Sequence, residues 1–375
     1  MLKTMTILGT RPDLIKMSRV IAELDYHTNH VLVHTGQNYD YELNEVFFSD
    51  LEIRRPDFFL DIKAKNAAQA IAQIIERADE LIVAEKPDAI LFYGDTNSCL
   101  AVIAAKRRQI PVFHMEAGNR CFDQRVPEEL NRKVLDHLSD INLVLTEHAR
   151  RYLIAEGIKP ETIIKTGSHM SEVLDHYLPK IKLSNILSKM DIGHKNYFVV
   201  SVHREENVDP KENLRQILES LNALADAYDF PVIVSTHPRT RKRLEELGEF
   251  KSSPKIDFIK PLGFCDYIWL MMNARCTISD SGTITEESAL LNIPAITIRN
   301  THERPEGMDV GTLVMSGLDK ASVLEAVKVT IGQYSQEKRV FQVPVDYLNK
   351  SVSKQIIKII LSYTNYVNRT VWQKF

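Results

Sequence analysis

The sequence is poor in the features that mark disulfide-rich, membrane and nucleic-acid-binding proteins. Its 375 residues include only four cysteines, and none of them has the CxxC spacing of metal and redox sites. Cys99, Cys121, Cys265 and Cys276 are scattered along the chain, which is typical of free thiols in a reducing compartment. We therefore expect a cytoplasmic protein. The net charge of -3 offers no electrostatic attraction for nucleic acid or an anionic membrane, so neither is expected as a partner.

Long hydrophobic runs are also missing. Runs such as residues 268–272 are far shorter than the ~20 residues that a helix needs to cross a bilayer. The first residues lead directly into a strand pattern, so we expect no signal peptide. The hydrophobic fraction of 44% and the charged fraction of 26% are ordinary for a globular protein, and the length favours two domains.

What the sequence does contain is an alternation of short β-rich runs with helical patterns. Strands are expected at 4–8, 30–34, 88–93, 111–115, 141–145, 197–202, 231–235, 256–259, 276–279 and 294–298. One helix is expected after Asn66, with apolar residues at i, i+3 and i+4 spacing, and others near 210–228, 238–247, 264–274 and 284–291. This alternation predicts parallel sheets with right-handed crossovers.

The expected fold class is therefore α/β, with two Rossmann-like doubly wound domains that face a cleft. The first domain is expected over residues 1–168 and carries the candidate acid–base residues. The second is expected over 169–352, because periodicity weakens near 168–196. A helical stripe at about 353–375 is expected to pack back on the first domain.

Three acids are expected at neighbouring strand exits of the first domain: Asp95, Glu116 and Glu128. Ligands of open α/β sheets bind beyond the carboxyl ends of the strands. Crowded carboxylates raise the pKa of at least one member, so that acid and base forms coexist near neutral pH. This combination suits the abstraction and return of a carbon-bound proton. The alternative is that the acids cap helices or form salt bridges with nearby arginines, namely Arg120, Arg125 and Arg132.

An anion site is expected where Ser281, Gly282 and Thr283 join a strand to a helix. The first amides of a helix lack internal partners, and the helix dipole favours an anion such as a diphosphate there. Glu287, about one turn later, could bind ribose hydroxyls. The alternative is a capping box, in which Ser or Thr and a later Glu satisfy the same amides.

Two cations and a histidine complete the candidate site. Arg11 and Lys16 follow the first strand and suit a diphosphate, although a solvated surface pair is the alternative. His203 follows a buried strand and could donate a proton or contact a leaving phosphate; the alternative is a hydrogen-bonded core histidine. His114 with Glu116, and His203 with Glu206, lack a third ligand, so we expect no metal site.

Together these motifs resemble the non-hydrolysing UDP-N-acetylglucosamine 2-epimerase family. The resemblance runs in order from about residue 5 to 315. The matching segments are Gly9–Pro12 with Lys16, Thr35–Gln37, Gly94–Thr96, His114–Gly118, Pro127–Glu129 with Asn131 and Arg132, His203–Glu205, Asp280–Gly282 with Glu286 and Glu287, and Glu303–Glu306. It implies a glycosyltransferase-B-like fold, a homodimer, a UDP-sugar substrate, and no metal or nicotinamide cofactor.

The resemblance also implies roles for individual residues. It makes Asp95, Glu116 and Glu128 the acid–base candidates and assigns His203 to the diphosphate and its departure. It implies that Glu287 binds the ribose. The remaining substrate-binding residues, most of them near the diphosphate, are Arg11, Lys16, Arg204, Ser281, Gly282, Thr283 and Arg304. The family reaction removes the C2 proton and expels UDP to give a glycal, after which UDP re-adds and C2 is protonated from the opposite face.

Three departures from the family pattern bear on the substrate. Thr283 replaces a usual glycine. The segment 35–41 lacks the histidine-containing continuation that helps to bind an activating second UDP-sugar, which argues against regulation by UDP-GlcNAc. The loop 119–127 is shorter than the usual one and, with segment 38–41, looks like the branch that makes UDP-N-acetyl-L-fucosamine from UDP-2-acetamido-2,6-dideoxy-L-talose for capsule or O-antigen synthesis.

Other functions stay open at this point. A UDP-GlcNAc/UDP-ManNAc 2-epimerase with a different loop is the first alternative, and a hydrolysing epimerase that releases UDP is a related one. A glycosyltransferase could use the same fold, but it needs an acceptor and no group of acids around C2. A nucleotide-sugar sensor would be expected to lack the three acids, which this chain retains.

Overall fold

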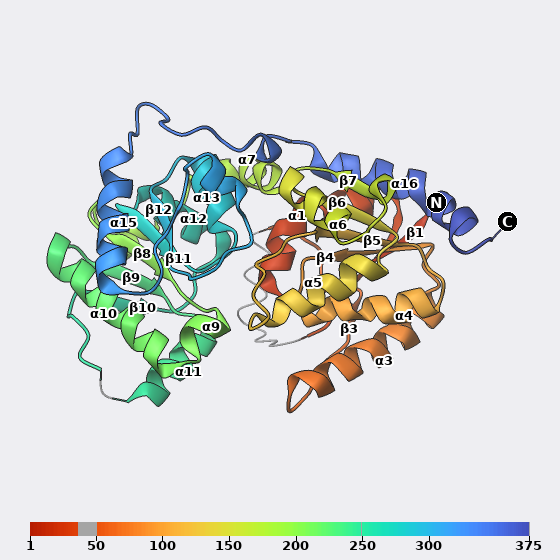
Figure 1. Cartoon of the computed structure of the whole chain (residues 1–375), viewed down its shortest axis with the longest axis horizontal. Helices are drawn as coiled ribbons and strands as arrows, with labels where there is room; N and C mark the ends of the chain where they lie inside the picture. Colours follow the sequence, from red (N-terminus) through yellow and green to blue (C-terminus); the bar gives the residue numbers. More distant parts are fainter. Residues whose placement is uncertain (37–50, 249, 375) are drawn as a thin grey trace. The chain divides into compact units, whose positions relative to one another are not determined.

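The chain forms two compact units (Figure 1). The structure is a computed structural model that describes residues 1–36, 51–248 and 250–374; the side chain of Arg11 also lies outside the described part. Unit 1 comprises Met1–His176 and Asp346–Phe375, and unit 2 comprises Tyr177–Val345. The chain therefore leaves unit 1 once, builds unit 2, and returns to unit 1 at residue 346.

Unit 1 is built on a parallel sheet of seven strands in the order β3-β2-β1-β4-β5-β6-β7. The order reverses between β1 and β4, and open α/β sheets bind ligands at such switch points. The strands are β1 (Lys3–Leu8), β2 (Asn29–His34), β3 (Phe58–Phe59), β4 (Ala89–Tyr93), β5 (Val112–Ala117), β6 (Ile141–Val144) and β7 (Ile163–Lys165).

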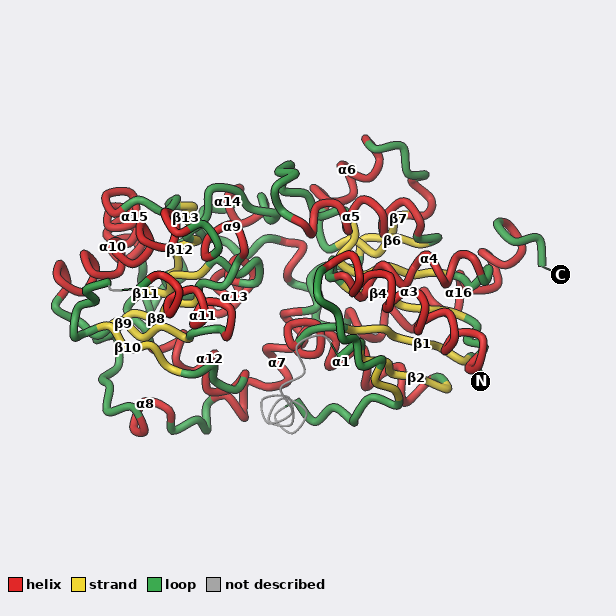
Figure 2. The backbone as a smooth tube through the Cα atoms, turned by 90° about the horizontal axis from the view of Figure 1, so that it is seen from below, coloured by secondary structure: helices red, strands yellow, loops and turns green. Residues whose placement is uncertain are grey.

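Helices flank the sheet of unit 1, and Figure 2 shows its strands lying between them. The longest near the C-terminus, α16 (Val352–Thr370), buries Ile356, Ile357 and Ile360 and packs against α1 (Arg11–His27). The others are α3 (Ala67–Glu85), η1 (Asn97–Ala101), α4 (Val102–Arg107), α5 (Pro127–Leu138), α6 (Glu147–Ala155) and η2 (Pro160–Thr162). Helix α7 (Met170–Ile181) begins in unit 1 and ends in unit 2. A short helix, η3 (Val345–Tyr347), precedes α16.

Unit 2 contains a parallel sheet of six strands in the order β10-β9-β8-β11-β12-β13. Its switch point lies between β8 and β11. The strands are β8 (Phe198–Ser201), β9 (Val232–Ser235), β10 (Ile256–Ile259), β11 (Cys276–Ser279), β12 (Ala295–Thr297) and β13 (Val314–Met315). The helices are α8 (Ile186–Lys189), α9 (Glu205–Val208), α10 (Lys211–Tyr228), α11 (Pro238–Leu247), α12 (Phe264–Asn273), α13 (Ile284–Leu291), α14 (Glu306–Asp309) and α15 (Lys320–Gln333).

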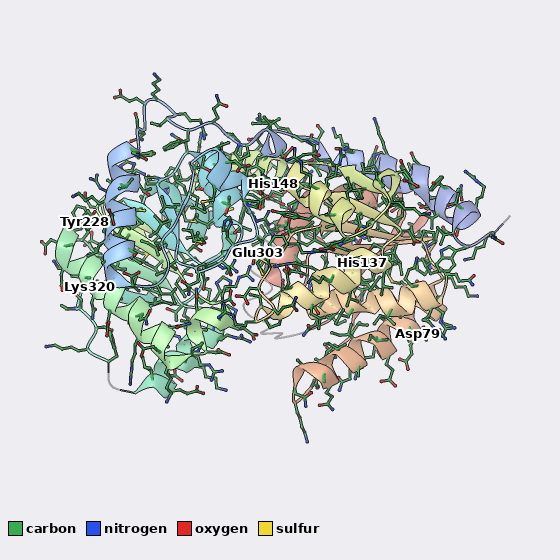
Figure 3. All side chains as sticks on the ribbon, in the orientation of Figure 1. Asp79, His137, His148, Tyr228, Glu303 and Lys320 are labelled. Atoms are coloured by element: carbon green, nitrogen blue, oxygen red, sulfur yellow. The ribbon has the colours of Figure 1, made fainter. Side chains whose placement is uncertain are left out.

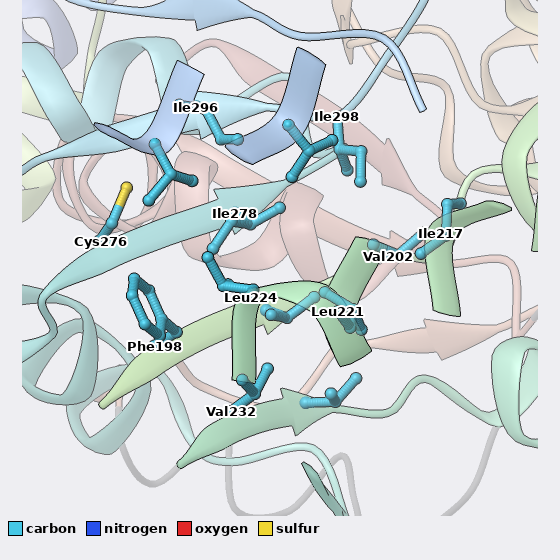
Figure 4. Packing of buried hydrophobic residues seen from close by; sticks show 14 of the residues in the cluster. Phe198, Val202, Ile217, Leu221, Leu224, Val232, Cys276, Ile278, Ile296 and Ile298 are labelled. Carbon is cyan, nitrogen blue, oxygen red and sulfur yellow. The ribbon is translucent and has the colours of Figure 1, made fainter. Parts of the chain in front are cut away.

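A hydrophobic core fixes the strands of each unit. In unit 2, Phe198, Ile278 and Ile296 of three strands pack with Leu221 and Leu224 of α10 (Figure 4). Full burial of one such side chain contributes about 1.5–3 kcal/mol. A comparable cluster in unit 1 joins β1, β2, β4 and β5 to α3 and α4. Because the apolar parts of the strands are held rigidly, the polar residues that follow them have fixed positions.

All ten strands predicted from the sequence are present, with small differences at their ends, and α11 and α13 have the predicted bounds. The helix expected after Asn66 is α3, and the Asn66 side chain caps it by accepting a hydrogen bond of 2.9 Å from the Gln69 amide. The sequence missed β3, β7 and β13, which have two or three residues and are too short to show a periodic pattern. Among the described residues, no helix is long and apolar enough to cross a membrane.

Candidate active site

Glu116 occupies an irregular backbone position at the end of β5. The β5–β6 register shifts between Met115 and Ala117, and Glu116 has a φ of 68°. This left-handed conformation is unfavourable for a side chain larger than glycine and persists only where the surroundings enforce it. One restraint is Gly118, at which an added Cβ would lie 2.6 Å from the Ala149 carbonyl oxygen. The backbone thus dictates where the carboxylate of Glu116 points.

The carboxylate of Glu116 is buried among three hydrogen-bond donors. Lys16 Nζ lies 3.0 Å from Oε2, and the phenol of Tyr93 donates to the same oxygen. The side-chain amide of Asn119 donates to Oε1 at 3.2 Å. The sequence identified Lys16 as a cation for a diphosphate, whereas the structure brings it to an acid. The sequence predicted no role for Tyr93, because a tyrosine at the end of an apolar strand is typical of a core residue.

A buried ion network supports this strand end. Asp136 of α5 lies 2.8 Å from His114 Nδ1 and 2.7 Å from Arg120, and it accepts from the Gly118 amide. Burial opposes ionisation of Asp136, but the hydrogen bond and charge of His114, together with Arg120, hold its pKa below the usual range. The other ring nitrogen of His114 lies 2.9 Å from the Gly94 carbonyl oxygen. His114 therefore ties the end of β4 to α5.

The neighbouring acids Glu128 and Glu129 differ in how deeply they are buried. Glu129 is fully buried and accepts from the amides of Cys121 and Phe122 at 3.1 and 3.2 Å. It also pairs with Arg132 at 2.9 Å. Glu128, in the same first turn of α5, is only half-buried. Glu129 therefore anchors the loop 119–127, and Glu128 is the member of the pair that is accessible to a ligand.

Asp95 lies just beyond β4 and pairs with Arg132, whose Nε is 2.8 Å from Oδ2. The alternative role for the acids was a salt bridge to Arg120, Arg125 or Arg132, and Asp95 does form one with Arg132. Arg120 pairs with Asp136 and Glu156, and Arg125 pairs with Asp123. Arg132 also contacts Glu129, so a single buried guanidinium fixes Asp95 relative to α5.

Asp13 is a further buried acid at the same sheet edge. Its carboxylate accepts from the amides of Gly9 and Thr10 at 3.2 and 2.9 Å and so holds the turn between β1 and α1. Burial raises its pKa from 3.8 to about 7, although hydrogen bonds from Thr10 and Gly9 and the charge of Lys16 oppose this rise. No sequence pattern indicates its burial, because an Asp in the first turn of a helix is usually exposed.

Unit 2 carries the second group of predicted residues, around Asp280 at the end of β11. Asp280 accepts hydrogen bonds of 2.9–3.1 Å from the amides of His203 and Arg204 and from the Asn207 side chain. His203 Nδ1 lies 3.2 Å from Oδ1 of Asp280. Burial lowers the pKa of His203, and the charge of Asp280 opposes that effect. Asp280 thus joins the ends of β8 and β11 at the switch point.

The turn of Ser281, Gly282 and Thr283 precedes α13, as predicted. The Ser281 and Thr283 hydroxyls lie 2.9 Å apart. The Ser281 hydroxyl accepts a hydrogen bond of 3.4 Å from the Thr283 amide, so a side chain already caps one amide of this turn. Within the described part of the chain, the Thr283 side chain makes no capping hydrogen bond to α13. A Cβ added to Gly282 would lie 3.6 Å from Arg304 and 3.7 Å from Arg204, so two guanidinium groups flank the turn.

Acidic residues hold these arginines in place. Arg304 pairs with Glu286 at 3.1 Å, and Arg204 lies 3.7 Å from Glu303, which also pairs with Arg299 at 2.8 Å (Figure 3 labels Glu303). The sequence missed the part played by Glu303 and Arg299 because their contacts depend on how the loop after β12 folds. Glu287, the predicted ribose ligand, is buried in α13. Two arginines beside the N-terminus of a helix form a site suited to a diphosphate.

Two predicted features lie outside the described residues: the side chain of Arg11 and the segment 37–41. Over residues 1–36, 51–248 and 250–374, no group of three His, Cys, Asp or Glu is arranged to hold a metal ion. The remaining candidates form two sets. Lys16, Asp95, Glu116 and Glu128 belong to unit 1, and His203, Arg204, Ser281–Thr283, Glu287 and Arg304 belong to unit 2.

Comparison with known proteins relates both sets to one family. The model of the UDP-N-acetylglucosamine 2-epimerase family matches residues 22–361. The structure of UDP-N-acetylglucosamine 2-epimerase from Rickettsia bellii is 56% identical, with a TM-score of 0.92 and full coverage of both chains (100%). The Methanocaldococcus jannaschii UDP-GlcNAc 2-epimerase, crystallised with UDP-GlcNAc and UDP, is 33% identical over 96% of this chain and 100% of its own, with a TM-score of 0.90.

A third relative has a different named substrate. The UDP-2,3-diacetamido-2,3-dideoxy-D-glucuronate 2-epimerase of Pseudomonas aeruginosa is 33% identical over 90% of this chain and 94% of its own. The expected fold class, two doubly wound α/β units of the glycosyltransferase-B type, is confirmed by the two parallel sheets and the matching structures. The chain belongs to the UDP-N-acetylglucosamine 2-epimerase family of isomerases.

Proposed function

We propose that this protein inverts C2 of a UDP-2-acetamido sugar by eliminating UDP and adding it back through a glycal. The observation that carries the proposal is the buried group of Glu116, Lys16 and Tyr93 beside Asp95 at adjacent strand ends. Removal of a proton from C2 requires a fixed carboxylate, and its return to the opposite face requires a second acid. This edge of the sheet of unit 1 supplies Asp95, Glu116 and Glu128 for these two steps.

Unit 2 binds the UDP group in this proposal. The amides of Ser281, Gly282 and Thr283 and the guanidinium groups of Arg204 and Arg304 contact the diphosphate. Positive charge held there stabilises the charge that develops on UDP as the C1–O bond breaks. Glu287 binds the ribose, and His203 contacts the departing phosphate. The complex of the M. jannaschii relative with UDP-GlcNAc and UDP supports a UDP-sugar as the ligand.

The sugar that we propose is UDP-2-acetamido-2,6-dideoxy-L-talose, which is converted to UDP-N-acetyl-L-fucosamine for capsule or O-antigen synthesis. Support comes from the loop 119–127, which differs from the usual family loop and is held by Glu129. A 6-deoxy sugar has a methyl group in place of a hydroxymethyl group, so an altered loop near the sugar is reasonable. The P. aeruginosa relative illustrates that family members act on different UDP-sugars. A homodimer is part of the same proposal.

The second candidate is a UDP-GlcNAc/UDP-ManNAc 2-epimerase, which the names of several relatives favour. Incubation of the protein in D₂O with each UDP-sugar separates the two. We expect NMR to show deuterium at C2 of the 6-deoxy L-sugar, with UDP retained on the sugar. Rapid exchange confined to UDP-GlcNAc would support the second candidate. Transfer of the sugar to an added acceptor without exchange at C2 would contradict both.

Substitution of the acids tests the mechanism independently of the sugar. Glu116→Gln is expected to abolish exchange at C2 while UDP affinity stays close to that of the wild type, because the amide keeps its shape but cannot take up the proton. Arg11→Ala, in contrast, is expected to weaken UDP binding. Exchange at the wild-type rate in Glu116→Gln would remove the acid–base assignment.

A further inference from the structure

Tyr93 and Glu116 meet because their strands are neighbours. β4 and β5 pair in parallel with Tyr93 opposite Met115, and the Gly94 amide donates to the Met115 carbonyl at 3.1 Å. The left-handed backbone of Glu116 then directs its carboxylate to the phenol, which donates to Oε2. The contact joins the ends of β4 and β5, one strand away from the switch point between β1 and β4.

The ring of Tyr93 has little freedom to move. It is almost fully buried, with 2% of its surface exposed. The ring of His169 packs edge-on against it, with centroids 5.3 Å apart and an interplanar angle of 85°. Lys16 Nζ lies 5.3 Å from the ring centroid while it also contacts Glu116. The phenol is therefore a donor in a fixed place, because rotation of the ring would break contacts on two sides.

The charged and titratable groups around the carboxylate come from several elements. Lys16 belongs to α1, Tyr93 to β4, and Asn119 to the loop after β5; His169 lies behind the phenol. His114, Arg120 and Asp136 support the backbone next to Glu116. Lys16 supplies charge, whereas the phenol supplies a directed hydrogen bond. A donor to the ionised form of a carboxylate lowers its basicity and limits its rotation.

From this geometry we propose that Tyr93 is a positioning residue for Glu116, which orients the carboxylate and sets the pH range in which it accepts a proton. The inference rests on the proposed function in one respect only, namely that Glu116 carries the C2 proton. Tyr93 itself need not touch the substrate. A purely structural tyrosine would affect the stability of β4 and leave the pH dependence of the reaction unchanged.

Tyr93→Phe tests the proposal, because it removes the hydroxyl and keeps the ring. We expect kcat for C2 exchange to fall about tenfold to a hundredfold, the usual weight of one hydrogen bond to a charged group, with KM changed less than twofold. The acid limb of the pH–rate profile should move up by about one pH unit. A raised KM with unchanged kcat, or an unshifted profile in a folded variant, would overturn the proposal.

Two further variants keep the test decisive. Tyr197→Phe is the matched control, since Tyr197 is fully buried and its hydroxyl donates to the Leu270 carbonyl at 2.7 Å in unit 2. It should leave the profile unmoved. Tyr93→3-fluorotyrosine keeps the side chain in place even if Tyr93→Phe fails to fold. Its more acidic phenol is a stronger donor, so the acid limb should move to lower pH; a shift in the opposite direction would contradict the proposal.

A measurement without turnover separates this inference from the proposed function. In protein labelled with ¹³C at glutamate carboxyl carbons, the Glu116 resonance is assigned by its loss in Glu116→Gln. Its titration midpoint should rise in Tyr93→Phe and stay constant in Tyr197→Phe. If none of the UDP-sugars exchanges at C2 but the midpoint rises, the proposed reaction is wrong and the positioning role stands. If exchange occurs and the midpoint does not move, the positioning role is wrong.

Discussion

At the scale of residues, neighbouring side chains of the same type serve different purposes. Glu129 is enclosed by the loop that it anchors, while Glu128 beside it is half-buried. The sequence could identify both as an acidic pair after a loop, because their position follows from the strand and helix pattern. It could not separate them, because burial depends on the contact with Arg132. Lys16 and Glu116, 100 residues apart, show the same limit: no local pattern predicts their contact.

Glu128→Gln is expected to lower activity and Glu129→Gln is expected to lower stability. Glu128→Gln should slow C2 exchange by about 10²–10⁴, the usual contribution of a proton donor or acceptor, with little change in stability. Glu129→Gln should lower the free energy of unfolding by about 1–3 kcal/mol, because Arg132 loses a buried charged partner. Urea denaturation and the exchange rate measure the two effects. Equal losses of activity and stability in both variants would contradict the distinction.

Asp13 is expected to make stability depend on pH. Its pKa in the folded protein is about 7, above the value of 3.8 for an exposed carboxyl, so the folded state binds the proton more tightly. Ionisation therefore opposes folding: stability is unaffected below about pH 4, falls as pH rises to about 7, and is constant above. Asp13→Asn removes this effect and keeps an acceptor for the Gly9 and Thr10 amides.

The variant should gain stability relative to the wild type across this pH window, by at most about 4 kcal/mol. Urea denaturation of both proteins between pH 4 and 8 measures the difference. A difference that does not change with pH would show that Asp13 is not protonated in the folded state.

At the scale of elements, a sequence pattern predicts the bounds of α13 but not its contacts. Its bounds follow from the apolar run before it and the turn residues that start it. What the pattern could not show is that Glu286, in its first turn, pairs with Arg304. This contact depends on the fold of the loop that carries Arg304, which lies outside the helix. The shortest strands were missed for a different reason: β13 has two residues and is defined by its neighbour.

Gly282→Ala is expected to separate binding from folding. The added Cβ would meet Glu303 at 3.5 Å, Arg304 at 3.6 Å and Arg204 at 3.7 Å, all ordinary contact distances, so the free protein should keep its stability. The methyl group would, however, occupy space that a diphosphate needs near the turn. We expect calorimetry to show UDP affinity lowered by about tenfold, equal to ~1.4 kcal/mol.

Gly332→Ala is the matched control, because a Cβ at that position in α15 meets nothing within 4 Å. It should leave UDP affinity unchanged and add about 0.5–1 kcal/mol of stability, as expected for alanine in a helix. Unchanged UDP affinity in Gly282→Ala would argue that the diphosphate does not bind at this turn.

At the scale of the whole molecule, two parallel sheets each have a switch point, and the candidate residues collect at both. The sequence could predict two such sheets because strands alternated with helices throughout. It could not give the order of the strands, since a crossover may place the next strand on either side of the sheet. In unit 1 this order puts β1 between β2 and β4, which brings Lys16 to Glu116.

Hydrogen exchange is expected to separate the roles of the two units. UDP alone should slow amide exchange most in unit 2, around residues 203–208 and 281–287, because it contacts that unit in our proposal. Residues 112–118 of unit 1 should gain their main protection only when a UDP-sugar is present. Mass spectrometry of peptic peptides measures both. Protection by UDP that is strongest around residues 112–118 would contradict the division of roles.

The interruption of unit 1 by unit 2 also sets an order for events on the ribosome. Domains generally fold as units while the chain is being synthesised. Every strand of unit 2 emerges before α16, yet α16 covers α1, which emerged near the start. Until translation reaches residue 370, the face of α1 that packs against α16 stays uncovered in the nascent chain. Unit 1, whose synthesis begins first, is thus completed after unit 2, and chaperones can bind α1 during that interval.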